Sequence, residues 1–155
     1  MKTLDIIIPV YKSKQTLEAL IARLNEWVET KSNLKIHVVF IEDGSGDGTY
    51  EFLLHLKNRI RFSSEVIRLM RNYGQHTAIS TGLSVSESEL VVIMDDDLQH
   101  DPFEIDKLIE ELKATDADLV YGVYKKKQHN VVRNLSSRVL KRITKSDAVA
   151  RADND

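Results

Sequence analysis

The sequence predicts an α/β fold in which a mostly parallel sheet carries helices on both faces. Three observations favour it: short apolar runs rich in branched residues, helical stripes of apolar residues between them, and polar loops directly after the runs. With 155 residues, 42% hydrophobic and 30% charged, the chain has the size and composition of one globular domain. It contains no cysteine, which excludes a disulfide framework and is compatible with a reducing compartment.

Five apolar runs are the candidate strands. Their hydrophobicity is continuous rather than alternating, which is typical of parallel strands buried on both faces. The runs are Leu4–Val10, Ile36–Ile41, Val66–Met70, Leu90–Met94 and Leu119–Val123.

Four helices are predicted between these runs. Three carry an apolar stripe with steps of three and four residues. The stripes are Leu17, Leu20, Ile21, Leu24, Trp27 and Val28 in the first helix, Phe52, Leu53, Leu56 and Ile60 in the second, and Ile105, Leu108, Ile109 and Leu112 in the fourth. The remaining helix has Ala78 and Gly82 on one face, which predicts a close approach of its backbone to the sheet.

The fourth helix has the clearest start signal in the chain. Asp101 is suited to cap it, Pro102 fits its first position, and Glu104 completes a capping box. We therefore expect this helix to begin just after Gln99.

Charge is distributed unevenly along the chain. Residues 1–118 carry 13 Lys/Arg and 21 Asp/Glu, whereas residues 119–146 carry eight Lys/Arg and no acid. We expect a core at 1–124, followed by a basic amphipathic segment and a polar tail at 125–155. The first apolar run is too short for a signal peptide or a membrane span, which favours a cytoplasmic protein.

The segment after the fourth run, Asp95–Asp101, carries the strongest functional signal. Three consecutive acids at the end of a buried strand repel one another, so a cation is expected to compensate them. In extended geometry Asp95 and Asp97 project to one side, and the amide oxygen of Gln99 continues the row. Oxygen ligands suit Mg²⁺ or Mn²⁺. The alternative is an exposed acidic loop that only caps the next helix.

The segment after the second run, Glu42–Thr49, is rich in glycine but lacks the spacing of a phosphate-binding loop. A carboxylate here suits the N–H of a base or the hydroxyls of a ribose. The alternative is a turn followed by a helix cap supplied by Asp47 or Thr49.

Four motifs, in their order along the chain, resemble those of family 2 glycosyltransferases. These enzymes have the GT-A fold, a Rossmann-like α/β architecture. They are Pro9-Val10-Tyr11, Glu42-Asp43-Gly44-Ser45, Asn72-Tyr73-Gly74-Gln75-His76 and Asp95-Asp96-Asp97-Leu98-Gln99-His100-Asp101-Pro102. Within the family, the chain is most similar to polyprenyl-phosphate glycosyltransferases of the dolichyl-phosphate mannose synthase and undecaprenyl-phosphate aminoarabinose transferase types. Members continue well beyond residue 155 into an acceptor-side half.

The resemblance implies a nucleotide-sugar donor, with UDP favoured over GDP, and a polyprenyl phosphate or similar acceptor. It implies that Asp43 accepts a hydrogen bond from the base and that Asp95, Asp97 and Gln99 bind the metal. Asp97 is also expected to be catalytic. The expected nucleotide-binding residues are Pro9, Val10, Tyr11, Asp43, Gly44, Ser45, Asn72, Gly74, Gln75, His76, Asp95 and Asp96.

The basic segment is expected to serve the acceptor. Apolar residues between Val131 and Ile143 alternate with cations, a pattern suited to an anionic membrane surface and a peripheral position at its inner face. Arg133, counted as catalytic, and Arg138 are the candidates for the acceptor phosphate. A solvated tail is the alternative, and nucleic acid is disfavoured because few aromatic residues accompany the cations.

Other functions stay open on the sequence. They are a transferase for a saccharide acceptor, a donor-binding module without turnover, and a receiver-like signalling domain, against which the Asp-x-Asp-x-Gln row argues. A homo-oligomer is also compatible with the sequence.

Overall fold

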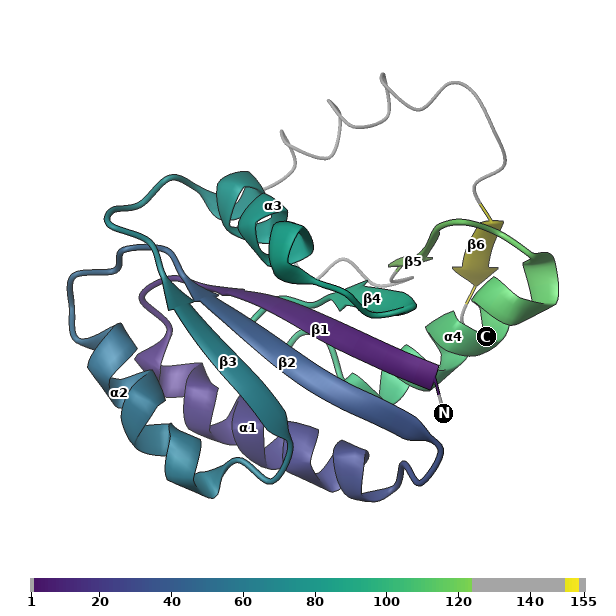
Figure 1. The fold of residues 1–155 in the computed structure, drawn as a ribbon, viewed down its shortest axis with the longest axis horizontal. Coiled ribbons are helices and arrows are strands. Elements are labelled where there is room, and N and C mark those ends of the chain that lie inside the picture. The colour runs from purple at the N-terminus through teal and green to yellow at the C-terminus, as the bar shows by residue number, and fades with distance from the viewer. Residues whose placement is uncertain (1, 124–149, 154–155) are drawn as a thin grey trace. The chain divides into compact units, whose positions relative to one another are not determined.

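The structure is a computed structural model that describes residues 2–123 and 150–153. The chain forms two compact units, residues 1–103 and residues 104–155. The first unit contains a four-stranded sheet with the order β3-β2-β1-β4 and parallel pairing throughout (Figure 1). Its strands are β1 (Lys2–Val10), β2 (Leu34–Glu42), β3 (Ser63–Arg68) and β4 (Leu90–Ile93). The predicted α/β fold with a mostly parallel sheet is therefore confirmed.

Helices cover both faces of this sheet, as parallel strands require. The first two, α1 (Lys14–Glu29) and α2 (Thr49–Leu56), lie on one face, and α3 (Gln75–Val85) lies on the other (Figure 1). A short 3-10 turn, η1 (Lys57–Arg59), follows α2.

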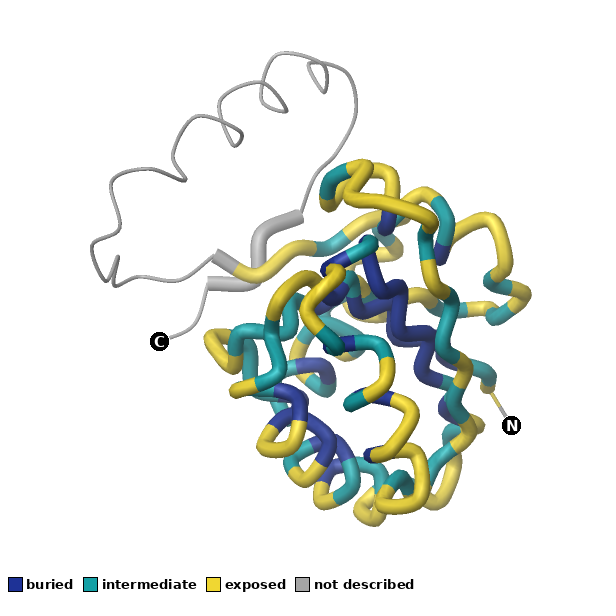
Figure 2. The backbone as a smooth tube through the Cα atoms, turned by 90° about the vertical axis from the view of Figure 1, so that its left-hand side faces the viewer, coloured by how far each residue is buried: buried dark blue, intermediate teal, exposed yellow. Residues whose placement is uncertain are grey.

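The apolar stripe predicted for the first helix is the buried face of α1. Its buried residues are Leu17, Leu20, Ile21, Leu24 and Trp27. Figure 2 shows the same division in the first unit, where buried stretches alternate with exposed turns along the helices. Burial of this stripe fixes how α1 lies on the sheet, and so fixes where the loop before α1 emerges.

The small residues of α3 allow the close approach that the sequence predicts. Ala78 and Gly82 are both buried, and Ala78 packs in a cluster with Ile7, Val39 and Ile41. A Cβ added at Gly82 would collide with the side chain of Ile7, so only glycine fits at this position.

Burial on both faces was predicted for all strands, and this prediction is wrong for β3 and β4. Both are edge strands of the described sheet, and each alternates between more and less exposed residues. On β4, Val91 is 39% exposed and Ile93 is 48% exposed. The third strand also ends at Arg68, and Met70, predicted to lie inside it, is 96% exposed in the loop beyond.

The start of the fourth helix differs from the prediction. Residues Pro102–Glu104 form a 3-10 turn, η2, and the α-helix α4 spans Ile105–Thr115. Asp101 caps this 3-10 turn, because its Oδ1 accepts the backbone N–H of Phe103 at 3.1 Å. It does not cap α4, whose N-cap residue is Glu104 and whose first turn receives no side-chain cap, so the predicted capping box is wrong. Glu104 forms an ion pair with Lys107.

In the second unit, β5 (Val120–Val123) pairs in parallel with β6 (Ala150–Asp153) and forms a two-stranded sheet. The sequence predicted a fifth strand here, and it did not predict β6, which lies within the stretch expected to be a polar tail. The predicted boundary after residue 124 falls at the edge of the described residues and stays a prediction.

Candidate active site

Four polar loops emerge at the carboxyl edge of the parallel sheet, because all four strands run in the same direction (Figure 1). These site loops comprise residues 11–13 after β1, 43–48 after β2, 69–74 after β3 and 94–101 after β4. The last is called the acid-rich loop below. The four sequence motifs thus meet at one edge of the first unit.

The loops after β1 and β2 are joined by hydrogen bonds through Ser45. Its hydroxyl accepts the backbone N–H of Lys12 at 2.9 Å, and its own N–H donates to Glu42 Oε1 at 2.6 Å. Lys12 has a φ of 54°, an uncommon backbone conformation for a residue with a side chain. Ser45, expected at the nucleotide, therefore also fixes the backbone next to Tyr11.

Glu42, which stands where the family more often has Asp, is buried and 1% exposed. Its Oε2 forms no hydrogen bond, and the Nε of Arg68 lies 3.6 Å away. The longer side chain places Oε1 on the N–H of Ser45, so this residue shapes the turn rather than facing outward.

Asp43 fixes the loop after β3. It is 3% exposed, and its two carboxylate oxygens accept the backbone N–H groups of Tyr73 and Gly74, each at 2.8 Å. Hydrogen bonds from backbone N–H groups to a buried carboxylate are among the strong ones. The geometry gives Asp43 a structural role that the sequence did not suggest, while its contact with a base stays a prediction.

The beginning of α3 lies beside the loop after β1. The Asn72 side chain hydrogen-bonds the exposed Tyr11 hydroxyl, and this contact together with Lys12 lowers the Tyr11 pKa. Asn72 Oδ1 also accepts the N–H of Gly74 at 2.9 Å. These bonds place Tyr11 next to the first turn of α3, which begins with Gln75 and His76.

The acid-rich loop is not the extended row that the sequence suggested. The strand ends at Ile93, Leu98 has a φ of 61°, and the N–H of Gln99 bonds back to Asp97 Oδ1 at 3.0 Å. The expectation of extended backbone at Asp95, Asp97 and Gln99 is therefore wrong, because a left-handed residue turns the chain between the last two.

The consecutive acids of this loop, Asp95 to Asp97, face different neighbours. Asp95 Oδ1 accepts a hydrogen bond from Gln75 Nε2 at 2.6 Å, which links this loop to the first residue of α3. Asp96 accepts from the Ser13 hydroxyl and from the backbone of Tyr11. Asp96 thus ties the acid-rich loop to the loop after β1, a structural role the sequence analysis did not assign to it.

Burial raises the pKa of Asp96, and the negative charges of Asp97 and Asp95 raise it further. The loop therefore carries mutually repelling charge, the physical condition that a divalent cation relieves. Two carboxylates and one amide oxygen fit Mg²⁺ or Mn²⁺ if donor phosphates or water complete the shell. Within residues 2–123 and 150–153, no group of three or more His, Cys, Asp or Glu side chains is arranged to hold a metal.

Two predicted site residues fall on a part of the chain that the structure does not describe, and one site residue was not predicted. Arg133 and Arg138 lie outside the described residues. The sequence analysis missed Ser13, whose position just after the Pro9-Val10-Tyr11 motif was the available signal.

Residues 5–154 match the family model of Glycosyl transferase family 2. The chain belongs to this family. It is 32% identical over 154 residues to an undecaprenyl-phosphate 4-deoxy-4-formamido-L-arabinose transferase of Pseudomonas savastanoi, covering 99% of this chain and 45% of the relative. It is 33% identical over 155 residues to the Aeromonas hydrophila protein of the same name, covering 99% and 47%. The chain thus spans less than half the length of these relatives.

Solved structures support the GT-A fold. Staphylococcus aureus TarS 1-349 in complex with UDP aligns with a TM-score of 0.61 at 22% identity, covering 84% of this chain and 38% of that one. Its complex with UDP-GlcNAc aligns with a TM-score of 0.60 at 21% identity, covering 84% and 37%. Among the described residues of the present chain, no helix has the length and apolar character to cross a bilayer.

Proposed function

We propose that this chain is the donor-binding part of a metal-dependent glycosyltransferase that moves a sugar from a uridine diphosphate sugar to a polyprenyl phosphate. The observation that carries the proposal is the meeting of the four site loops at one sheet edge. Asp43 and Asp96 join these loops in pairs. Ligands of open parallel sheets bind at this edge.

The chemistry of the acid-rich loop supports a metal. Asp95, Asp97 and Gln99 would hold Mg²⁺ or Mn²⁺, and the bound ion supplies Lewis-acid stabilisation of the departing diphosphate. The mutual repulsion of the three acids supports this assignment, since it is a cost to the metal-free protein that binding removes.

The chain's own residues would orient the donor. Tyr11 lies exposed beside Asn72 and offers a ring and a hydroxyl to the base and ribose. The first turn of α3 begins with Gln75 and His76, and the amino end of a helix favours an anion. The Gln75 side chain links this turn to Asp95. Asp97 would act as a catalytic residue by holding the metal at the diphosphate as the bond to the anomeric carbon breaks.

The acceptor is inferred from the relatives. Their names specify undecaprenyl phosphate as the group to which the sugar is transferred. A phosphate acceptor is already an anion, so it needs cations to hold it more than a base to activate it. Arg133 and Arg138 remain the proposed contacts, at the surface of an anionic membrane.

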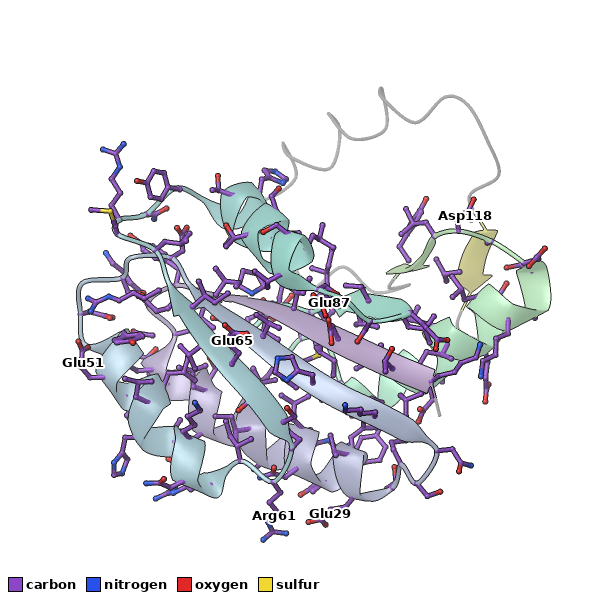
Figure 3. All side chains as sticks on the ribbon, viewed as in Figure 1. Glu29, Glu51, Arg61, Glu65, Glu87 and Asp118 are labelled. Atoms are coloured by element: carbon purple, nitrogen blue, oxygen red, sulfur yellow. The ribbon has the colours of Figure 1, made fainter. Side chains whose placement is uncertain are left out.

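The donor site is tested by calorimetric titration of UDP and of GDP with and without Mn²⁺. We expect UDP to bind only with Mn²⁺, and Asp97→Asn to weaken this binding at least about tenfold. Asp118→Asn is the matched control, because Asp118 is an exposed acid outside the site loops (Figure 3). Binding of UDP that is equal with and without Mn²⁺ would refute the metal.

A transfer assay separates the remaining alternatives. Release of UDP from a UDP-sugar that depends on added polyprenyl phosphate supports the proposed acceptor, and dependence on a saccharide supports a different one. Donor binding without release with either acceptor identifies the chain as a binding module.

A further inference from the structure

We infer that Arg23 of α1 is a positioning residue for the acid-rich loop, which it holds in place through Asp101. The inference rests on the proposed function, because the loop so positioned is the one proposed to take the metal. It assigns a role to a helix that carries none of the family motifs quoted above.

The contact between Arg23 and Asp101 is bidentate. Arg23 Nε donates to Asp101 Oδ1 at 3.2 Å, and Arg23 Nη2 donates to Asp101 Oδ2 at 2.8 Å. Two parallel bonds from the planar guanidinium fix the orientation of the carboxylate as well as its position. A lysine at position 23 would keep the charge but lose this geometry.

Asp101 also contacts Phe103, which packs against Arg23 as well. Its Oδ1 accepts the N–H of Phe103 at 3.1 Å, and the Phe103 ring lies under the Arg23 guanidinium, 4.3 Å from ring centroid to Cζ. Arg23 Nη1 is itself held by Glu26 at 2.8 Å. The Arg23 and Asp101 side chains are each 43% exposed, so the hydrogen bonds and the ring contact, rather than burial, orient the guanidinium. Together they clamp the end of the loop onto α1.

This contact matters because the loop between Met94 and Asp101 is turned rather than regular. At its start, the N–H of Met94 bonds to the carbonyl of Ile7 at 3.1 Å, so β1 holds that end. In between, Leu98 adopts a left-handed conformation that residues with side chains rarely keep without support. Asp96 ties the first half of the loop to Ser13, so Asp101 holds the other end. With Asp101 released, the segment that carries Asp97 and Gln99 would lose its anchor on the carboxyl side.

Neither Arg23 nor Asp101 belongs to the set proposed to touch the metal or the nucleotide, which makes the pair separable from direct binding.

The test compares Arg23→Gln, Arg23→Lys, Asp101→Asn and the double variant Arg23→Gln/Asp101→Asn in the full chain. Asn at 101 keeps an oxygen for the Phe103 N–H. Arg61→Gln is the matched control, because Arg61 forms an ion pair with Glu29 at the far end of α1 (Figure 3). The readouts are calorimetric affinity for UDP with Mn²⁺, hydrogen exchange of the amides of residues 95–100 without ligand, and urea unfolding.

We expect Arg23→Gln to weaken UDP–Mn²⁺ binding about tenfold and to speed exchange in the loop, with Arg23→Lys in between. The double variant should bind no more weakly than Arg23→Gln alone, since both changes break one contact. Arg61→Gln should leave binding and loop exchange as in the wild type.

The inference is overturned if the wild type binds UDP with Mn²⁺ and Arg23→Gln binds equally well, even where its stability falls. Absence of nucleotide binding by the wild type refutes the proposed function instead. In that event the exchange measurement still decides whether Arg23 orders the loop, and unchanged exchange overturns the positioning role.

Discussion

The backbone of Gly44 lies directly against the backbone of Arg71, so that a Cβ at position 44 would overlap the Cα and carbonyl carbon of that residue. Gly44 also has a φ of 60°, in the left-handed region. The loops after β2 and β3 can meet only because this residue has no side chain. Their contact brings Asp43 within reach of the N–H groups that it accepts.

Gly44→Ala is therefore expected to destabilise the protein, and Gly46→Ala offers a matched control. Gly46 has a φ of 66° but no atom within 4 Å of an added Cβ, so alanine there costs only the left-handed strain of about 1 kcal/mol. At Gly44 the backbone overlap adds about 1–3 kcal/mol. Urea unfolding of both variants measures the difference, and equal losses would contradict the close contact.

Asp43→Asn should loosen the loop after β3. An amide retains one acceptor oxygen and turns its NH₂ toward a backbone N–H, so one of the two bonds to Tyr73 and Gly74 is lost. We expect the free energy of unfolding to fall by about 1–3 kcal/mol, and the amides of both residues to exchange faster. Hydrogen exchange resolved to these amides is the measurement, with Asp118→Asn as control. Unchanged protection would mean that the carboxylate does not organise this loop.

Asp5 should make stability depend on acid pH. Burial raises its pKa, but hydrogen bonds from the hydroxyls of Ser86 (2.6 Å) and Ser88 (2.7 Å) and the nearby His37 outweigh burial, so the pKa lies below 3.8. A carboxyl with a lowered folded-state pKa stabilises the protein above the unfolded value, and this contribution disappears as pH falls through the folded value.

Removing both hydroxyls, as Ser86→Ala/Ser88→Ala, should therefore cost about 2 kcal/mol at pH 7. The deficit should shrink below the ordinary Asp pKa of 3.8, where the carboxyl becomes protonated. Urea unfolding between pH 7 and pH 2.5 tests this. Ser84→Ala is the control, because the Ser84 hydroxyl donates to the backbone carbonyl of Thr81 within α3 and not to Asp5. A deficit that stays constant with pH would contradict the role of charge.

The features that the sequence predicted correctly are those that depend on the spacing of residues within one helix. The stripe of α1 and the paired small residues Ala78 and Gly82 follow from spacing within one helix, and both predictions are confirmed. The carboxyl-edge location of the motifs followed from parallel strands alone. These features need no knowledge of distant contacts.

What the sequence could not predict depends on contacts between distant segments or on single backbone angles. Arg23 and Asp101 are 78 positions apart, and neither position signals the other. The left-handed Leu98 has no glycine to mark it, so the acid-rich loop was expected to continue the strand. The exposed face of β4 was unpredictable for a related reason, since an apolar run does not show that its strand lies at an edge.

Gln75 gives a test of the metal that does not need a nucleotide. Its Nε2 donates to Asp95 Oδ1 at 2.6 Å, so Gln75→Glu would place a second carboxylate against the first. The metal-free variant should lose stability through like-charge repulsion, about 1 kcal/mol at this exposed position. A divalent cation would relieve that repulsion, so Mn²⁺ should raise the melting temperature of Gln75→Glu more than that of the wild type.

Ser80→Glu, on an exposed position of the same helix, adds equal charge and should show the wild-type response. Equal Mn²⁺ shifts in all three proteins would count against a cation at Asp95, since a carboxylate placed beside a bound divalent ion must strengthen its binding.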